Sequence, residues 1–318
     1  MNQTDKPALI VLTGPTAVGK SELSIALAGQ IGGEIISADS MQVYRHMDIG
    51  SAKIMPDQMG SIPHHLIDVL EPTEEFNVVA FQQMVKDAIS SIYARGHVPI
   101  VVGGTGFYIQ ALLYDIDFTE NDEDAELRTQ LEKIAAVQGS EVLFEQLRSI
   151  DPESCEIIHA NNVKRVIRAI EFYQKTGLKI SDHNKAQRRN VSPYNFAYFV
   201  LNDDRDKLYD RIEKRVDQML MQGLENEVSR LASLGCSREM VSMQGLGYKE
   251  MLDYLDGRTT LEDAIYLIKR DTRHFAKRQL TWFRREKDVT WVNKPDFGYD
   301  NERITGYMLD ILHRKNII

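Results

Sequence analysis

Short apolar runs and amphipathic stretches alternate over residues 8–113 of the chain. The run Ala8–Thr13 is apolar and rich in β-branched residues, which predicts a strand buried in a parallel sheet. Lys20–Ile31 has apolar residues at helical spacing, and the two glycines after it favour the end of a helix. The same reasoning predicts strands at 34–37 and 99–102 and a helix at 79–94. This order is typical of an α/β fold with a doubly wound parallel sheet.

The pattern changes after about residue 115. An acidic patch (Glu120, Asp122, Glu123, Asp124 and Glu126) leads into predicted helices at 124–138, 140–150 and 161–176. The next strand-like run is 194–201, followed by helices at 204–222, 224–234, 247–256, 260–285 and 301–314 and a short strand at 289–292. We therefore predict an α/β core made of residues 1–114 and 194–318, interrupted by an all-helical insertion domain at 115–193.

The composition is that of an ordinary globular protein. The chain has 318 residues, 43% of them hydrophobic, so it can bury a sizeable core without disulfides or metal. Its two cysteines, Cys155 and Cys236, are far apart and fit neither a zinc site nor a structural disulfide. The N-terminal residues are polar, and the apolar run after them is too short for a signal peptide or a membrane span. We expect a cytoplasmic protein with no membrane partner.

The charge is unevenly distributed. The net charge of −9 argues against a nucleic-acid partner. However, residues 164–189 contain eight lysines and arginines against two acidic side chains, and residues 269–287 contain the same numbers. Each basic block fits a solvated helix face, but two of them in an acidic chain also keep a phosphate-backbone partner open.

The loop after the first predicted strand carries the clearest motif. The residues Gly14, Pro15, Thr16, Ala17, Val18, Gly19, Lys20 and Ser21 match the phosphate-binding P-loop pattern without a departure. The glycines let backbone N–H groups point at phosphate oxygens, Lys20 adds positive charge, and the following helix adds its dipole. Ser21 can coordinate the Mg²⁺ that accompanies a diphosphate. The motif predicts a phosphate-bearing substrate and leaves its identity open.

Two further polar residues follow predicted strands. Asp39 comes after the second strand and Thr105 after the third, within Gly-Gly-Thr-Gly. Because ligands of open α/β sheets bind outside the carboxyl ends of the strands, both residues are expected near the P-loop. Asp39 could bind Mg²⁺ or accept a proton there, and it could equally be a loop residue or helix cap. Thr105 offers a hydroxyl group to the same crevice.

Together these segments resemble the transfer RNA dimethylallyltransferases, which act on adenine 37 beside the anticodon. The shared motifs are Gly14–Ser21, Ile36–Tyr44, Met47–Lys53, Pro63–Asp68, Gly103–Tyr108, Arg211–Asp217, Gly245–Glu250 and Lys277–Arg284. They occur in family order and cover nearly the whole chain. The P-loop alone is shared with many kinases, whereas the Asp-Ser-x-Gln-Val-Tyr and Gly-Gly-Thr-Gly-x-Tyr motifs are far more specific.

The resemblance implies that the P-loop binds the diphosphate of dimethylallyl diphosphate rather than ATP. Lys20, Mg²⁺ at Ser21 and an arginine would stabilise the charge of the departing diphosphate. Asp39 would accept a proton from the adenine amine, and Thr105 would help to hold the reacting groups. Arg215 aligns with the family's catalytic arginine. Read without the resemblance, Arg211 and Arg215 fit a surface ion-pair ladder with Glu213 and Asp217.

The resemblance also implies how the RNA is recognised. The family extrudes the adenine from the anticodon loop, as chemistry on a base edge requires. Ser40, Met41 and Gln42 would contact the extruded base, and the insertion would clasp the tRNA anticodon stem-loop. The remaining candidate RNA contacts are basic or amide side chains of the two basic blocks and their surroundings: Arg128, Lys164, Arg165, Arg278, Gln279 and Arg284. For each of them a solvated surface position is the alternative.

Two departures from the family pattern and three competing functions accompany this prediction. Asn162 stands where many relatives have Asp, so we expect a lost charge or helix cap. The chain as given carries no C-terminal Cys/His zinc module, which we expect of the bacterial form, acting as a monomer.

The alternatives are a P-loop kinase of small molecules, an isopentenyltransferase of free adenine nucleotides, and a P-loop regulator without catalytic activity. The long basic insertion favours RNA over a free nucleotide.

Overall fold

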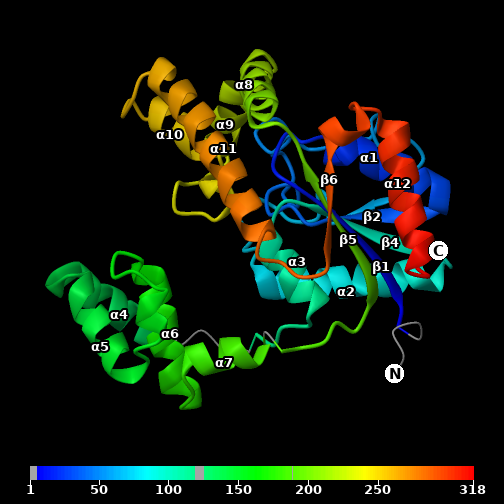
Figure 1. Ribbon diagram of the computed structural model, residues 1–318. Coiled ribbons are helices and arrows are strands. Elements are labelled where there is room, and N and C mark those ends of the chain that lie inside the picture. The colour runs from blue at the N-terminus through cyan, green and yellow to red at the C-terminus, as the bar shows by residue number, and fades with distance from the viewer. Residues whose placement is uncertain (1–5, 119–124, 188) are drawn as a thin grey trace. The chain divides into compact units, whose positions relative to one another are not determined.

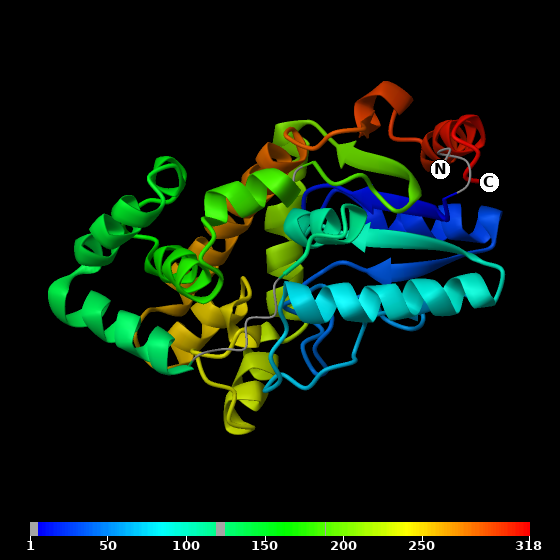
Figure 2. The same cartoon turned by 90° about the horizontal axis from the view of Figure 1, so that it is seen from below.

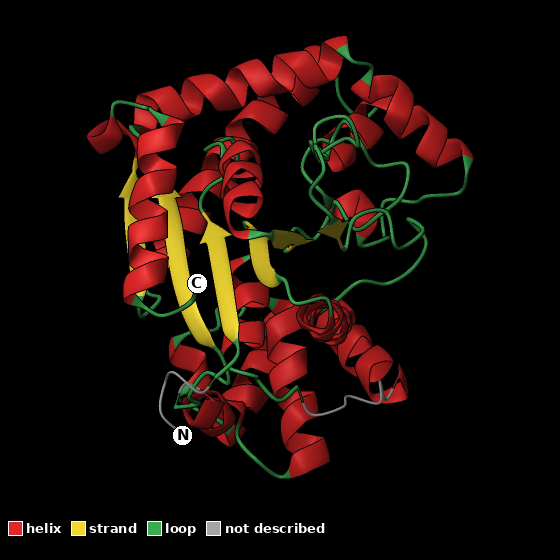
Figure 3. Cartoon of the chain, turned by 90° about the vertical axis from the view of Figure 1, so that its right-hand side faces the viewer, coloured by secondary structure: helices red, strands yellow, loops and turns green. Residues whose placement is uncertain are grey.

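The computed structural model describes residues 6–118, 125–187 and 189–318. Its centre is a six-stranded, all-parallel sheet with the order β3-β2-β4-β1-β5-β6. The strands are β1 (Ala8–Thr13), β2 (Gly33–Ser37), β3 (His64–His65), β4 (Val98–Gly103), β5 (Asn195–Asn202) and β6 (Val289–Asn293). The long strands run in the same direction, so that their carboxyl ends share one edge (Figure 3). The chain therefore folds as the doubly wound α/β protein that the apolar runs predict.

Helices cover both faces of the sheet. Helices α1 (Lys20–Ile31) and α12 (Asn301–Arg314) lie on one face, and α2 (Val78–Ala94) lies on the other (Figures 1 and 2). The short helix α3 (Gly106–Leu113) packs beside α2. Strands that are buried on both sides need apolar side chains at successive positions, which explains the unbroken run of β1.

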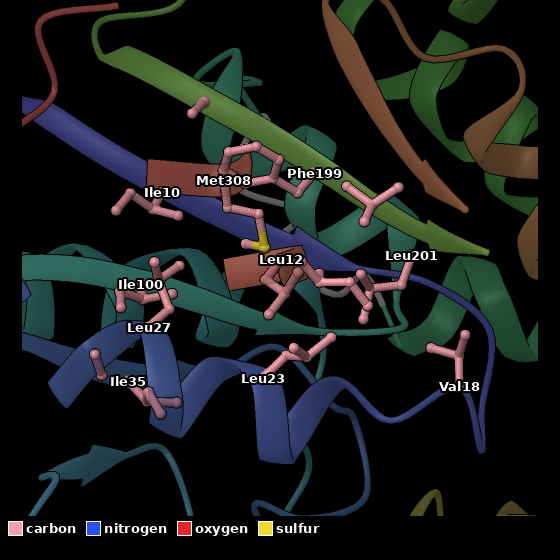
Figure 4. Packing of buried hydrophobic residues seen from close by; sticks show 14 of the residues in the cluster. Ile10, Leu12, Val18, Leu23, Leu27, Ile35, Ile100, Phe199, Leu201 and Met308 are labelled. Carbon is pink, nitrogen blue, oxygen red and sulfur yellow. The ribbon is translucent and has the colours of Figure 1, made fainter. Parts of the chain in front are cut away.

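The main core lies between the sheet and helices α1 and α12. Ile10 and Leu12 of β1 pack there with Leu23 and Leu27 of α1 and with Met308 of α12, all with no exposed surface (Figure 4). Burying a side chain of this size contributes roughly 1.5–3 kcal/mol, so this layer is a large part of what holds α1 on the sheet. The P-loop that precedes α1 is thereby fixed at its helical end.

Helices α8–α11 form the rest of the core unit. They are α8 (Arg205–Met221), α9 (Leu224–Ser233), α10 (Tyr248–Leu255) and α11 (Leu261–Phe283). The 3₁₀ turn η3 (Ser242–Gln244) lies between α9 and α10, and the 3₁₀ turn η4 (Lys294–Phe297) lies between β6 and α12. Helices α8 and α11 lie side by side (Figure 1). Two ion pairs join them: Arg273 with Glu213 at 2.6 Å and Lys269 with Asp217 at 2.6 Å.

The chain divides into two compact units, residues 1–113 with 193–318 and residues 114–192. The second unit contains α4 (Ala125–Gln138), α5 (Ser140–Ile150), the 3₁₀ turn η2 (Ser154–Glu156), α6 (Val163–Thr176) and α7 (Ile180–Gln187). It has a core of its own, in which Leu131, Leu147, Val166 and Ile170 are buried. This unit is helical throughout its described elements, and Glu120, Asp122, Glu123 and Asp124 of the acidic patch lie outside the described residues.

Most elements lie within one or two residues of the sequence predictions, and three were missed. The two-residue strand β3 is too short to show a pattern. Helix α3 begins inside the Gly-Gly-Thr-Gly motif, where we predicted no helix, and the sequence of α7 is too polar to show an apolar helical face. The expected loss of the cap at Asn162 is wrong, because its side chain accepts the N–H of Arg165 at 3.4 Å and caps α6.

Candidate active site

The loop Gly14–Ser21 has the backbone shape that its motif predicts. Gly14 and Gly19 take positive φ angles of 149° and 95°, and Ala17 takes 62°. A side chain at Gly14 would lie 2.6 Å from the carbonyl oxygen of Leu201, so only glycine fits there. The chain then enters α1 with Gly19 as its N-cap residue. Free N–H groups at the start of α1 make this loop a favourable place for an anion.

The P-loop faces the end of β4 across the centre of the sheet. Successive connections turn to opposite sides at β4 and β1, so these neighbouring strands mark the switch point of the sheet. Thr13 pairs with Gly103 in the strand register, and its hydroxyl donates to the Gly103 carbonyl at 2.7 Å. The P-loop and the Gly103–Thr105 segment are therefore held side by side, with Thr105 half-buried at the same edge.

Gln279 of α11 joins these two loops. Its Oε1 accepts the N–H of Thr16 at 2.9 Å, and its Nε2 donates to the carbonyl of Gly104 at 3.0 Å. The side chain is 6% exposed, and a side chain at Gly104 would lie 2.2 Å from its Nε2. The sequence predicted Gln279 as an RNA contact. In the structure both ends of its amide are engaged in positioning the loops of the site.

Lys20, Asp39 and Arg215 are brought within electrostatic range of one another. The ammonium of Lys20 donates to the carbonyls of Gly14 at 3.0 Å and Pro15 at 2.9 Å. Burial, with a smaller contribution from Arg215, lowers the pKa of Lys20 to about 8, while Asp39 opposes the shift. Burial and Arg211 also lower the pKa of Arg215, again opposed by Asp39. Two desolvated cations beside one carboxylate form a site that favours an anionic ligand.

Asp39 is oriented by its own backbone. Its Oδ1 accepts the N–H of Met41 at 2.9 Å, which turns the chain directly after β2, and its Oδ2 is not used in that turn. The chain here approaches β4 closely, because a side chain at Gly103 would lie 2.3 Å from the Ala38 carbonyl oxygen. Both features present the Asp39 carboxylate at the edge where Thr105 lies.

Arg211 and Arg215 take different roles on α8. Arg211 donates to the Ala17 carbonyl at 2.9 Å and pairs with the buried carboxylate of Asp203, so it braces the P-loop from behind. The ladder with Glu213 and Asp217 is wrong, since those carboxylates pair with Arg273 and Lys269 of α11. Arg215 instead lines a cavity.

This cavity has a volume of about 1080 Å³ and begins at the end of the P-loop. Ser21 and Arg215 line it together with the segment Asp48–Met55 and with α8 and α9. Ile25, Ile54 and Met219 give its wall an apolar part. The lining also carries carboxylates, those of Glu22, Asp48 and Glu227, so the cavity offers apolar surface and groups of both charges next to the P-loop.

The segment that lines this cavity is held by Glu227, a residue that the sequence did not single out. One carboxylate oxygen accepts the N–H groups of Asp48 at 2.9 Å and Ile49 at 2.8 Å; the other accepts Gly50 N–H at 3.0 Å and the Tyr248 hydroxyl at 2.8 Å. Burial and Glu227 raise the pKa of Tyr248, which keeps its hydroxyl a donor. Glu227 is 5% exposed, so it occupies the backbone nest as a fixed internal anion.

Lys53 fixes the other end of the same segment. Its ammonium is buried and donates at 2.6 Å to each of three oxygens, those of the Tyr44 carbonyl, Asp48 and Asp68. This lysine belongs to the motif Met47–Lys53 that the chain shares with the family, but the sequence analysis assigned it no role. Only the folded chain brings Asp48 and Asp68 to the same ammonium.

The remaining predicted site residues are placed as follows. Ser40, Met41 and Gln42 follow Asp39 directly; Met41 packs on Gly245, and Gln42 Nε2 donates to the Ala52 carbonyl at 3.4 Å. Arg278 and Arg284, on and just after α11, are exposed. In the separate helical unit Lys164 and Arg165 are exposed on α6, while Arg128 pairs with the buried Glu171 at 3.1 Å.

A magnesium ion would find one protein ligand at the P-loop. Among the described residues, no group of three or more His, Cys, Asp or Glu side chains could hold a metal ion. Mg²⁺ in phosphate sites usually keeps several waters and takes one or two protein oxygens plus the phosphates. Ser21, whose residue lines the cavity at the start of α1, fits that mode of binding.

The fold and the groups at this edge of the sheet define a P-loop α/β protein. In it an acidic side chain lies next to a positively charged anion-binding site. The family described as IPP transferase matches residues 42–286, and the chain belongs to that family. The chain is 59% identical to a tRNA dimethylallyltransferase of Lachnoclostridium phytofermentans, over 98% of this chain and 99% of that protein.

Solved structures similar to this chain agree with its membership of this family. A tRNA isopentenylpyrophosphate transferase from Bacillus halodurans matches with a TM-score of 0.74 and 44% identity, covering 98% of each chain. A eukaryotic dimethylallyltransferase acting on tRNA matches with a TM-score of 0.78 and 32% identity, over 90% of this chain and 74% of that one. Within the described part of the chain, no helix has the length and apolar character needed to cross a membrane.

Proposed function

We propose that this protein transfers the dimethylallyl group of dimethylallyl diphosphate to N6 of adenine 37 in tRNAs. The observation that carries the proposal is the meeting of Lys20, Asp39 and Arg215 at the P-loop edge. The family membership and the printed activities of the relatives support it. A kinase would need the same loop for ATP, but nothing in the chain or its relatives favours that function.

In this reaction the bond between N6 and the allylic carbon forms while the bond from that carbon to the diphosphate oxygen breaks. The leaving diphosphate takes the electron pair of the broken bond. Lys20, Arg215 and the N–H groups of the P-loop would stabilise its negative charge, which is where electrostatic catalysis contributes most. Asp39 would accept the proton that N6 loses. Its Oδ1 accepts the Met41 N–H in the backbone turn, and that turn does not use Oδ2. Thr105, at the end of β4, would hold the amine against the allylic carbon.

We also propose that Ser21 holds Mg²⁺ on the diphosphate. The ion would supply Lewis-acid stabilisation of the phosphate oxygens. The residue that would touch it, Ser21, begins the first turn of α1 and lines the cavity beside Arg215. The protein's own contribution is then to fix the direction from which the diphosphate enters.

The helical unit is proposed to clasp the anticodon stem-loop. Lys164 and Arg165 are exposed on one helix of that unit, as phosphate contacts must be. Ser40, Met41 and Gln42 would contact the extruded adenine, Gln42 through its amide, and the exposed Arg278 and Arg284 would contact the RNA backbone. We also propose that the protein acts as a monomer in the cytoplasm.

The test uses the full chain, Mg²⁺, labelled dimethylallyl diphosphate and an unmodified anticodon stem-loop with adenines at 36–38. We expect label in the RNA, none when adenine 37 is replaced by guanine, and a loss of roughly 10²–10⁴-fold in Asp39→Ala. Asp310→Ala, which removes an exposed carboxylate on α12 that does not line the cavity, is the matched control. Transfer to free AMP instead of RNA would support the nucleotide enzyme, and ATP consumption without transfer would support a kinase.

A further inference from the structure

A second lysine approaches the P-loop from the other end of the chain. Lys294 follows β6 directly, at the same carboxyl edge of the sheet as the P-loop. Its ammonium lies 3.4 Å from the Val18 carbonyl oxygen, and a side chain at Gly19 would come within 3.1 Å of it. Lys294 therefore reaches the end of the loop, whereas Lys20 covers its beginning at Gly14 and Pro15.

The backbone around Lys294 is held in place. The side chain of Asn293 accepts from Asn202 of β5 at 3.0 Å and donates to Asp296 at 3.1 Å. Lys294 then opens the 3₁₀ turn η4, whose Phe297 packs against the main core. The sheet and the core therefore fix the backbone position of Lys294, from which its side chain extends to Gly19.

No carboxylate of the described residues lies within ion-pair distance of the Lys294 ammonium. Asp203, whose charge acts on Lys294, already pairs with Arg211 and accepts the Tyr299 hydroxyl at 2.9 Å. Among the described residues Lys294 forms no ion pair, and its one hydrogen-bond acceptor is the distant Val18 carbonyl. Burial and Arg211 lower its pKa, while Asp203 and Glu22 oppose the shift. An ammonium has three donors, so this arrangement leaves donors for an anion at the start of α1.

We infer that Lys294 is a further diphosphate-binding residue, which together with Lys20 brackets the phosphate groups in the P-loop. This inference rests on the proposed function. When the bond to the allylic carbon breaks, the diphosphate gains negative charge, and a cation at Gly19 would stabilise that charge on the side that Lys20 does not cover. The role also explains why a lysine is held beside Gly19, a position where any side chain would meet the ammonium.

The probe is inorganic diphosphate, titrated calorimetrically into the full-length protein with Mg²⁺. Losing one charged hydrogen-bond donor should weaken binding roughly 10- to 100-fold in Lys294→Met, and Lys294→Arg should recover part of it. Lys20→Met is the positive control. Lys315→Met is the matched negative control, because Lys315 also touches a single carbonyl, that of Phe196 at 3.3 Å, near the opposite end of the strands.

Steady-state transfer assays separate a binding role from a structural one. Lys294→Met should raise the KM for dimethylallyl diphosphate and leave the KM for the RNA unchanged; a parallel rise of both would show that Lys294 only supports the fold. Normal diphosphate binding in Lys294→Met but not in Lys20→Met would overturn this inference and leave the proposed function standing. Normal binding in both variants would overturn the diphosphate site and the proposed function with it.

Discussion

The carboxylate of Glu227 is the most informative group to perturb, because four donors depend on it and none of them belongs to a catalytic residue. Glu227→Gln keeps the shape of the side chain and removes the charge. The amide has one oxygen, which can serve either the Asp48 and Ile49 N–H groups or the Gly50 N–H and the Tyr248 hydroxyl. The Tyr248 hydroxyl can turn and accept from the new amide, but a backbone N–H cannot.

The magnitude follows from this count. In its better orientation the glutamine leaves the Gly50 N–H facing an NH₂ group, and the two remaining bonds lose their charge assistance. An unsatisfied buried donor costs about 1–3 kcal/mol, and each lost charge contribution costs somewhat less. We expect local opening of the segment Asp48–Lys53 to become easier by about 2–4 kcal/mol, which is roughly a 30- to 1,000-fold change in the opening equilibrium.

Hydrogen–deuterium exchange of peptides spanning residues 45–53 measures this change directly. Glu227→Gln should speed exchange in those peptides, and Tyr248→Phe, which removes one donor, should have a smaller effect. We expect kcat/KM for dimethylallyl diphosphate to fall as well, because the segment lines the cavity beside Ser21. If exchange and kcat/KM both stay within twofold of the wild type, the nest around Glu227 does not position the cavity wall.

Three other predictions concern groups of the same core unit. Gln279→Leu leaves the Thr16 N–H and the Gly104 carbonyl without partners, so the P-loop should loosen by roughly 2–4 kcal/mol and the KM for dimethylallyl diphosphate should rise; an unchanged KM would contradict the clamp. The pKa of Lys20 is lowered to about 8, so the ammonium is present below and lost above that pH; kcat/KM should fall above pH 8, and Lys20→Arg should lack this alkaline limb. Burial raises the pKa of Glu286 to about 7, so the fold is destabilised as pH rises from about 4.5 through 7; Glu286→Gln should be more stable than the wild type by about 1–3 kcal/mol at pH 8, with thermal melts converging toward pH 5.

The sequence predicted the fold well because local rules and tertiary structure agree in it. The apolar run of β1 and the glycines around α1 allow few other conformations, and both elements have the predicted bounds. The failures have a physical cause as well. Strand β3 is two residues of an extended connection that pairs with β2, and the apolar α3 has too few residues for a helical period to be distinct.

The candidate site was predictable where a single motif or strand end places a residue. Lys20 and Asp39 could be found because a loop pattern and the parallel sheet fix their positions. Glu227 and Lys294 could not, since their partners, the Asp48–Gly50 N–H groups and the Val18–Gly19 turn, lie far away in the sequence. Gln279 was expected at the RNA, and nothing local shows that its amide would meet Thr16 and Gly104.

The order of the strands has a consequence for synthesis of the chain. β1, the strand that carries the P-loop, is flanked by β4 and β5, and β5 is made only after the whole of residues 114–192. Until then, one edge of an apolar strand is open on the nascent chain, a state that invites mispairing. The helical unit, with its own core, can collapse during this interval. We therefore expect the P-loop strand to be the part of the molecule most dependent on chaperones while the ribosome is still translating it.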